Sequence, residues 1–99
     1  MKFRVAARAD REIRAASAWW AKNRPYAPRL FAEDLEAAFD LIEQFPHAGE
    51  PVIHRRIEGL RRVLMNHVQY YVYYTILGDE EAVEILALRH TSRGTMFRL

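Results

Sequence analysis

Residues 59–93 have the sequence GLRRVLMNHVQYYVYYTILGDEEAVEILALRHTSR, and this stretch decides the fold. Residues 68–77 (VQYYVYYTIL) are rich in β-branched and aromatic side chains, which favour strands. Residues 82–89 (AVEILALR) are nearly all apolar, as expected of a central strand that is buried on both faces. Another strand is predicted at residues 59–65, and Gly78-Asp79 supplies the turn between the last two strands. The C-terminal part of the chain is therefore predicted to form three consecutive strands.

Two helices are predicted upstream of these strands. The clearer one runs from Pro28, a residue tolerated at a helix start, to about Phe45, and Pro46 ends it. Its apolar positions recur at helical spacing, and they are Phe31, Leu35, Ala38, Ile42 and Phe45. The other runs from Asp10, a suitable N-cap, to about Asn23. Its apolar face consists of Ile13, Ala16, Ser17 and Trp20. Because few residues join the two helices, they are expected to form an antiparallel hairpin.

Residues 2–8 alternate between apolar and charged side chains, which predicts a strand with one exposed face. The element order is then strand, helix, helix, strand, strand, strand. This order indicates an α+β fold with a single domain across residues 1–99. We expect an N-terminal strand, an antiparallel helical hairpin on one sheet face, and a three-stranded antiparallel C-terminal meander in the same sheet. The other sheet face is expected to be partly bare.

Composition excludes several classes of site. The chain has no cysteine, so disulfides and thiolate metal sites are excluded. The four histidines do not form an HxxxH or HExxH pair, and no metal or other cofactor is expected. The apolar runs are far shorter than a membrane span needs, and the N-terminus lacks the apolar core of a signal peptide. We therefore expect a cytoplasmic protein with no membrane contact.

The net charge is only +2, but the charge is unevenly distributed. Residues 1–30 carry eight Lys/Arg and two acids, residues 31–50 carry six acids and no Lys or Arg, and residues 51–99 carry seven Arg and five acids. Lys2 and Lys22 are the only lysines. Arginine suits bidentate contact with phosphate or carboxylate groups better than lysine does. A GC-rich genome, which favours arginine codons, would explain the excess of arginine over lysine equally well.

The motifs and their order resemble those of the RelE/ParE superfamily of bacterial toxins. The matching pieces begin with AxAD at residues 7–10, Trp19-Trp20 before a proline, and Phe45-Pro46 with a glycine soon after. They continue with GLRRV at residues 59–63, YYVYY at residues 70–74 and VEILALRHTSR at residues 83–93. The last three pieces, in this order behind a helical hairpin, carry most of the resemblance.

The resemblance implies a toxin of a type II toxin–antitoxin (plasmid-stabilisation) system that causes growth arrest. ParE-like members inhibit DNA gyrase without a known chemical step of their own, whereas RelE-like members cleave mRNA at the ribosome. In both groups the C-terminal segment of a cognate antitoxin wraps the toxin, so a hetero-oligomer is expected. We expect a ParE-like gyrase inhibitor, with an mRNA endoribonuclease and a non-toxic interaction module of the same fold as the alternatives.

RNA cleavage through a 2′-hydroxyl needs a base, an acid and cations that stabilise the phosphate. Candidate catalytic residues for this alternative are His90, Arg61, Arg89 and Arg93. His90 would then serve two proton-transfer roles, because arginine stays protonated and no tyrosine follows Tyr74. The two lysines are far from the later strands in the sequence. A gyrase inhibitor requires no acid–base set, so it fits these residues better.

Contact with the target or with the antitoxin is predicted for a small set of residues, namely Trp19, Arg61, Arg62, Arg89, His90 and Arg93. Each also has an ordinary structural explanation. His90 at a strand end is at least as often a hydrogen-bonded residue at the edge of the core. Arg61 and Arg62 are expected on opposite faces of one strand. Trp19 and Trp20 cannot both lie on the apolar helix face, so one of them is expected to be half exposed.

Overall fold

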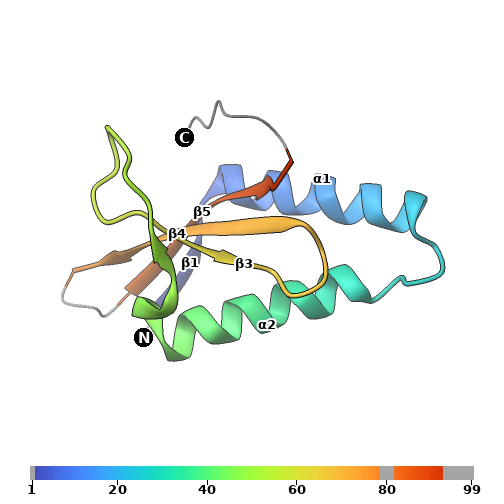
Figure 1. Ribbon diagram of the computed structural model, residues 1–99, viewed down its shortest axis with the longest axis horizontal. Helices are drawn as coiled ribbons and strands as arrows, with labels where there is room; N and C mark the ends of the chain where they lie inside the picture. Colours follow the sequence, from blue (N-terminus) through green and yellow to red (C-terminus); the bar gives the residue numbers. More distant parts are fainter. Residues whose placement is uncertain (1, 79–81, 93–99) are drawn as a thin grey trace.

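The computed structural model describes residues 2–78 and 82–92, which form two helices, a short 3-10 helix and one five-stranded sheet (Figure 1). The elements are β1 (Lys2–Val5), α1 (Ala7–Asn23), α2 (Leu30–Gln44), η1 (Pro46–Ala48), β2 (Glu50–Pro51), β3 (Arg61–Leu64), β4 (Tyr70–Leu77) and β5 (Ala82–His90). The strand order is β1-β5-β4-β3-β2. The predicted α+β class is confirmed.

The three C-terminal strands form the predicted antiparallel meander. Arg62 pairs with Tyr73 between β3 and β4, and Tyr73 pairs with Ala87 between β4 and β5. A register shift follows Tyr73, so that Tyr74 pairs with Ile85. The N-terminal strand β1 lies on the other side of β5 and runs parallel to it. The chain between these two strands contains the whole helical hairpin, as a parallel connection requires.

The helices pack on one face of the sheet and enclose the main core. Ala16 of α1 and Ile42 of α2 lie in the same buried cluster as Tyr74 of β4 and Ile85 of β5. Figure 1 shows the two helices running antiparallel, joined by a turn at one end of the molecule. The helical periodicity of residues 31–42 is therefore explained by burial against the sheet. The prediction that Phe45 continues this apolar stripe was wrong, because Phe45 is the C-cap of α2 and is 60% exposed.

The opposite sheet face is partly covered, as expected, and the covering segment is the excursion between β2 and β3. Val52 and Ile57 of this excursion pack against a smaller buried cluster that consists of Leu60, Tyr73 and Ala87. Leu64 on the same face is 51% exposed. The face therefore has one covered part and one part open to solvent.

Several predicted boundaries were wrong. β1 ends at Val5 because α1 begins at Ala7, and Ala6 N–H makes the last hydrogen bond to β5, at Ile85 O (2.9 Å). The N-cap is Ala6, which has no side-chain cap, and Asp10 lies in the first turn, where a carboxylate favours the positive helix end. α2 begins at Leu30 instead of Pro28. β2 was not predicted, because it has only two residues and includes a proline.

No helix in the described part of the chain is long and apolar enough to cross a membrane.

Candidate functional site

The sheet face away from the helices brings Arg62 together with two tyrosines. Arg62 Nε lies 2.5 Å from Glu50 Oε1, and its Nη1 donates to Tyr73 Oη at 3.3 Å. The guanidinium carbon stands 4.1 Å from the centre of the Tyr71 ring, a cation–π contact. Hydrogen bonds to Tyr73 and Glu50 raise the pKa of the Arg62 guanidinium further above its ordinary value. Arg62 is therefore a permanent cation with fixed partners, and it cannot act as a base.

Arg61 serves the opposite face, as the strand alternation predicted. Its Nη1 donates to Gly49 O at 2.6 Å and to His47 O at 3.2 Å, so it fastens the turn around η1 to β3. Tyr74 fastens the same turn, because its hydroxyl donates to Pro46 O at 2.6 Å. Burial raises the pKa of Tyr74, so the phenol remains a donor at neutral pH. Through its contacts with Gly49 O and His47 O, Arg61 positions the turn.

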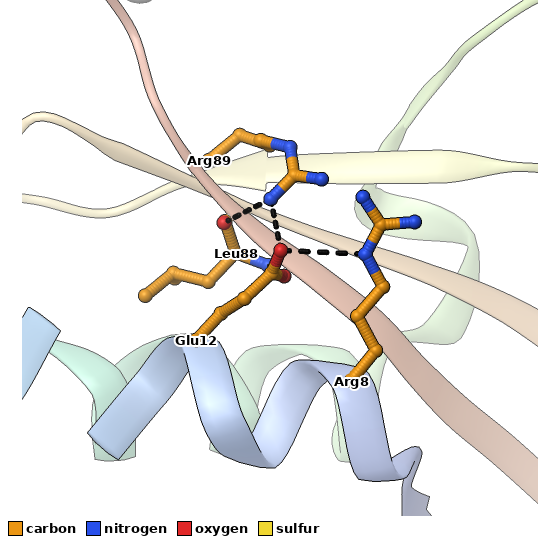
Figure 2. A network of polar contacts seen from close by, with 4 residues as sticks. All are labelled: Arg8, Glu12, Leu88 and Arg89. Carbon is orange, nitrogen blue, oxygen red and sulfur yellow. Dashed lines mark hydrogen bonds and ion pairs between the residues drawn. The ribbon is translucent and has the colours of Figure 1, made fainter. Parts of the chain in front are cut away.

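Arg89 belongs to a polar network that joins α1 to β5 (Figure 2). Glu12 of α1 accepts a hydrogen bond from Leu88 N–H at 3.0 Å and forms an ion pair with Arg89. Arg89 also donates to Leu88 O at 3.4 Å, and Arg8 Nε lies 3.4 Å from Glu12. The network satisfies backbone groups of β5 beyond the end of β1, where no strand of the described chain pairs with β5 on that side.

His90 lies on the helix-facing side of β5. Its ring packs edge-on against Tyr70, with ring centroids 5.1 Å apart. Ser92 N–H donates to His90 Nδ1 at 3.1 Å, and Ser92 Oγ lies 2.7 Å from the same nitrogen. Nδ1 thus acts as an acceptor in a local turn. Arg93, which was predicted beside His90, lies outside the described residues.

Trp19 is the half-exposed member of the tryptophan pair, at 47% exposure. Trp20 is partly buried and packs against the core, and its Nε1–H donates to Ala27 O at 2.7 Å. The prediction that one of the two rings would be half exposed is therefore confirmed.

A groove of about 260 Å³ runs between α2 and β3. Its lining residues are Asp34, Ala37, Ala38, Leu41, Val63, Leu64, Met65 and Asn66. β2 pairs only with Arg61 and Arg62, so no strand of the described chain covers the rest of the outer edge of β3 beside this groove. An apolar groove beside an open strand edge can hold an added peptide segment.

Asp34 at one end of the groove is an acidic residue that the sequence interpretation missed. It is only 3% exposed, and its carboxylate accepts hydrogen bonds from the amides of His67 (2.5 Å) and Val68 (2.8 Å). His67 Nδ1 also lies 2.8 Å from it. Burial acts to raise the pKa of Asp34, but these hydrogen bonds outweigh it and the pKa lies below its ordinary value. The helical spacing from Phe31 to Ala38 places residue 34 beside the apolar stripe, which was the available signal.

The predicted site residues do not converge on one point. Arg62 is on the open face, Arg61 is at the η1 turn, Arg89 is tied to Glu12, and His90 packs on the side of the helices. Within residues 2–78 and 82–92, no group of three metal-binding side chains is close enough to hold an ion. Arg61, Arg62, Arg89 and His90 therefore do not form one site, and the nearest polar contact of His90 Nδ1 is the hydroxyl of Ser92, at 2.7 Å.

Comparisons with known proteins agree with this architecture. The sequence model of one protein family, the ParE toxin of the type II toxin–antitoxin system parDE, matches residues 3–94 of this chain. A structure of the chromosomal ParDE system from P. aeruginosa has a TM-score of 0.71 at 13% identity, covering 93% of this chain and 97% of that chain. The structure of the intact E. coli RelBE toxin–antitoxin complex has a TM-score of 0.60 at 15% identity, covering 93% of this chain and 98% of that chain.

A third similar structure is the RelBE2 toxin–antitoxin complex from Mycobacterium tuberculosis, with a TM-score of 0.57 at 26% identity, covering 90% of this chain and 95% of that chain. No curated protein sequence matches the chain. The family model spans nearly the whole chain, and the similar structures share its fold. The chain therefore belongs to the ParE toxin family of type II toxin–antitoxin systems.

Proposed function

We propose that this toxin arrests growth in the bacterial cytoplasm by binding DNA gyrase, and that it performs no chemical step of its own. The observation that carries the proposal is the position of His90, the only residue that the sequence offered for proton transfer. Its ring is packed against Tyr70 and its Nδ1 accepts from Ser92, on the sheet side opposite Arg62. A general base must lie within hydrogen-bond reach of the proton that it removes, near the cations that stabilise the phosphate.

The cations also favour binding over catalysis. Arg62 is paired with Glu50 and stacked on Tyr71, and Arg89 is paired with Glu12. Cations that stabilise a developing charge must be directed at the reacting group, whereas these two are directed at partners within the chain.

The test is induced expression of the chain alone in bacteria, with growth, DNA breakage and mRNA integrity followed together. Growth arrest with DNA breaks and intact messages supports gyrase inhibition. Cleavage of messages within translated codons would instead make the chain a ribosome-dependent ribonuclease, as in the RelE-like alternative. Normal growth with soluble protein present would identify a non-toxic interaction module.

The second part of the proposal is a cognate antitoxin that lies along the groove between α2 and β3. Leu41 and Leu64 line this groove and are 40% and 51% exposed, so an amphipathic segment would bury apolar surface there. The product of the adjacent reading frame should co-purify with the toxin, and Leu41→Asp should release it while exposed Asp40→Asn should not. Failure of the wild-type pair to co-purify would refute this assignment.

A further inference from the structure

The turn that joins α1 to α2 forms one end of the molecule (Figure 1), and the chain around it contains aromatic and basic residues. Trp19 is 47% exposed and Tyr26 is 78% exposed. Three cations lie in the same stretch of chain, namely Lys22, Arg24 and Arg29. We call these five residues the hairpin tip.

Positive charge at the hairpin tip is not balanced locally. Between Glu12 and Glu33 the chain contains four Lys/Arg and no Asp or Glu, and one of the four, Arg14, pairs with Asp10. In the part of the chain that the structure describes, the side chains of Lys22 and Arg29 make no hydrogen bond or ion pair. Arg62 and Arg89, by contrast, are each paired with a carboxylate. The uncompensated charge is available to an anionic partner.

The hairpin tip is also held in place. Trp20 donates from Nε1 to Ala27 O at 2.7 Å, and Arg24 N–H donates to Trp20 O at 2.8 Å. Two further backbone bonds, from Ala27 to Arg24 O and from Leu30 to Ala27 O, close the turn. A partner that binds here would lose little free energy in ordering the turn, because these bonds already order it.

Large exposed aromatics on a rigid element are typical of protein contact sites. Tryptophan, tyrosine and arginine are the residues most enriched among the dominant contacts of interfaces. Trp19 and Tyr26 would gain from burial, and the surrounding cations require that the covering surface be acidic. These two properties together define the partner as an acidic protein surface with an apolar centre.

A nucleic acid fits the hairpin tip less well. Base stacking needs an open ring face. The guanidinium carbon of Arg24 lies 5.2 Å from the Trp19 ring centre and covers one face, and the tilted Trp20 ring is 6.4 Å away. These contacts leave less of the Trp19 ring open for base stacking, while Arg24 can donate to a carboxylate beside it.

We propose that the hairpin tip is the surface by which the toxin docks on an acidic patch of its target protein. This inference rests on the proposed function, in which the target is DNA gyrase. It separates target binding at the end of the helical hairpin from antitoxin binding in the groove between α2 and β3.

The experiment compares two tip variants with a matched control. The tip variants are Trp19→Ala/Tyr26→Ala and Lys22→Glu/Arg29→Glu. The control is Arg55→Glu/Arg56→Glu, which makes the same change of charge in the β2–β3 excursion at the other end of the molecule (Figure 1). Growth arrest, affinity for purified gyrase, affinity for the antitoxin and urea unfolding are measured for each.

Each tip variant is expected to bind gyrase about 30-fold or more weakly and to lose growth arrest, since two dominant contacts are removed or repelled. The affinity for the antitoxin and the free energy of unfolding should stay at wild-type values in the tip variants. The Arg55→Glu/Arg56→Glu control should stay toxic. Salt should weaken the wild-type interaction and affect the charge-reversed variant less.

Four results would overturn the inference: tip variants that remain fully toxic, tip variants that lose antitoxin binding, a control that loses toxicity equally, or displacement of the toxin from gyrase by free duplex DNA. Growth arrest that requires the hairpin tip in the absence of any gyrase binding would support the docking surface and refute gyrase as the target. A wild-type chain that neither arrests growth nor binds gyrase would overturn both proposals.

Discussion

Gly49 and Tyr74 approach so closely that a side chain at residue 49 has no room. Gly49 N–H donates to Tyr74 Oη at 2.9 Å, and a Cβ added to Gly49 would lie 2.2 Å from that oxygen. Gly49 has an ordinary extended backbone (φ −67°), so contact alone excludes other residues. Tyr74 is fully buried and reaches across 25 residues of sequence to hold the turn that follows α2.

Gly49→Ala should lower the free energy of unfolding by about 3 kcal/mol, because the buried tyrosine cannot move aside. The same substitution should cost less in a Tyr74→Phe background, where the hydroxyl oxygen is absent. Urea unfolding of the four proteins measures this coupling. Gly59→Ala is the control, since its Cβ would meet nothing within 4 Å and its cost comes from the positive φ of 72°. That cost should be the same in both backgrounds. Two ring carbons of residue 74, each 2.7 Å from the added Cβ, remain in the Tyr74→Phe background, so an equal cost for Gly49→Ala in both would refute the claim that the hydroxyl oxygen is the main obstacle.

Asp34→Asn should destabilise the fold by about 1–3 kcal/mol at neutral pH, because two amides and His67 lose a charged acceptor. The pKa of Asp34 is lowered in the folded state, so its stabilisation is complete above the ordinary value of 3.8 and is lost as the pH falls through the folded value. The difference between wild type and variant, measured by urea unfolding, should therefore shrink below about pH 4. Asp40→Asn on the exposed face of α2 is the matched control, and a difference that is independent of pH would contradict the account.

The Glu12–Arg89 pair should couple α1 to β5 energetically. Glu12→Ala removes the acceptor of Leu88 N–H as well as the partner of Arg89, so it should cost about 2 kcal/mol. A double-mutant cycle with Arg89→Ala should give a coupling of about 1 kcal/mol, because both side chains are partly buried. The exposed pair Asp10–Arg14 provides the comparison, and its cycle should give about 0.5 kcal/mol or less. Equal coupling energies in the two cycles would refute the claim that the partly buried Glu12–Arg89 pair couples α1 to β5 more strongly than an exposed ion pair does.

His90→Phe should leave growth arrest unchanged. Phenylalanine keeps a ring against Tyr70 and removes the two imidazole nitrogens, so the fold should be retained while any proton transfer by this side chain is lost. Removal of a general acid or base lowers a rate by roughly 100-fold to 10,000-fold, and an effect of that size on toxicity is the result expected of a ribonuclease. The dose of inducer that halves the growth rate measures the difference, with the amount of soluble toxin as the control.

The strands at residues 70–77 and 82–90 were predictable because their apolar and β-branched composition matches their buried position in the sheet. β2, by contrast, has too few residues to form a pattern. The helix periodicity predicted which face is buried, but the start of α1 depends on where β1 stops pairing with β5. The partners of the arginines were not predictable. Glu12 and Arg89 are separated by 77 residues, and only the folded sheet brings them together. A list of cations from the sequence therefore overstates how many are available to an outside partner.

The most direct test of the central claim is a cleavage assay with purified DNA gyrase, supercoiled plasmid and purified toxin. We predict that broken plasmid accumulates with increasing toxin, that wild-type and His90→Phe toxins act at the same concentration, and that added antitoxin reverses the effect. Unchanged gyrase activity, together with cleavage of mRNA on purified ribosomes that His90→Phe abolishes, would contradict the claim that this chain acts by binding alone.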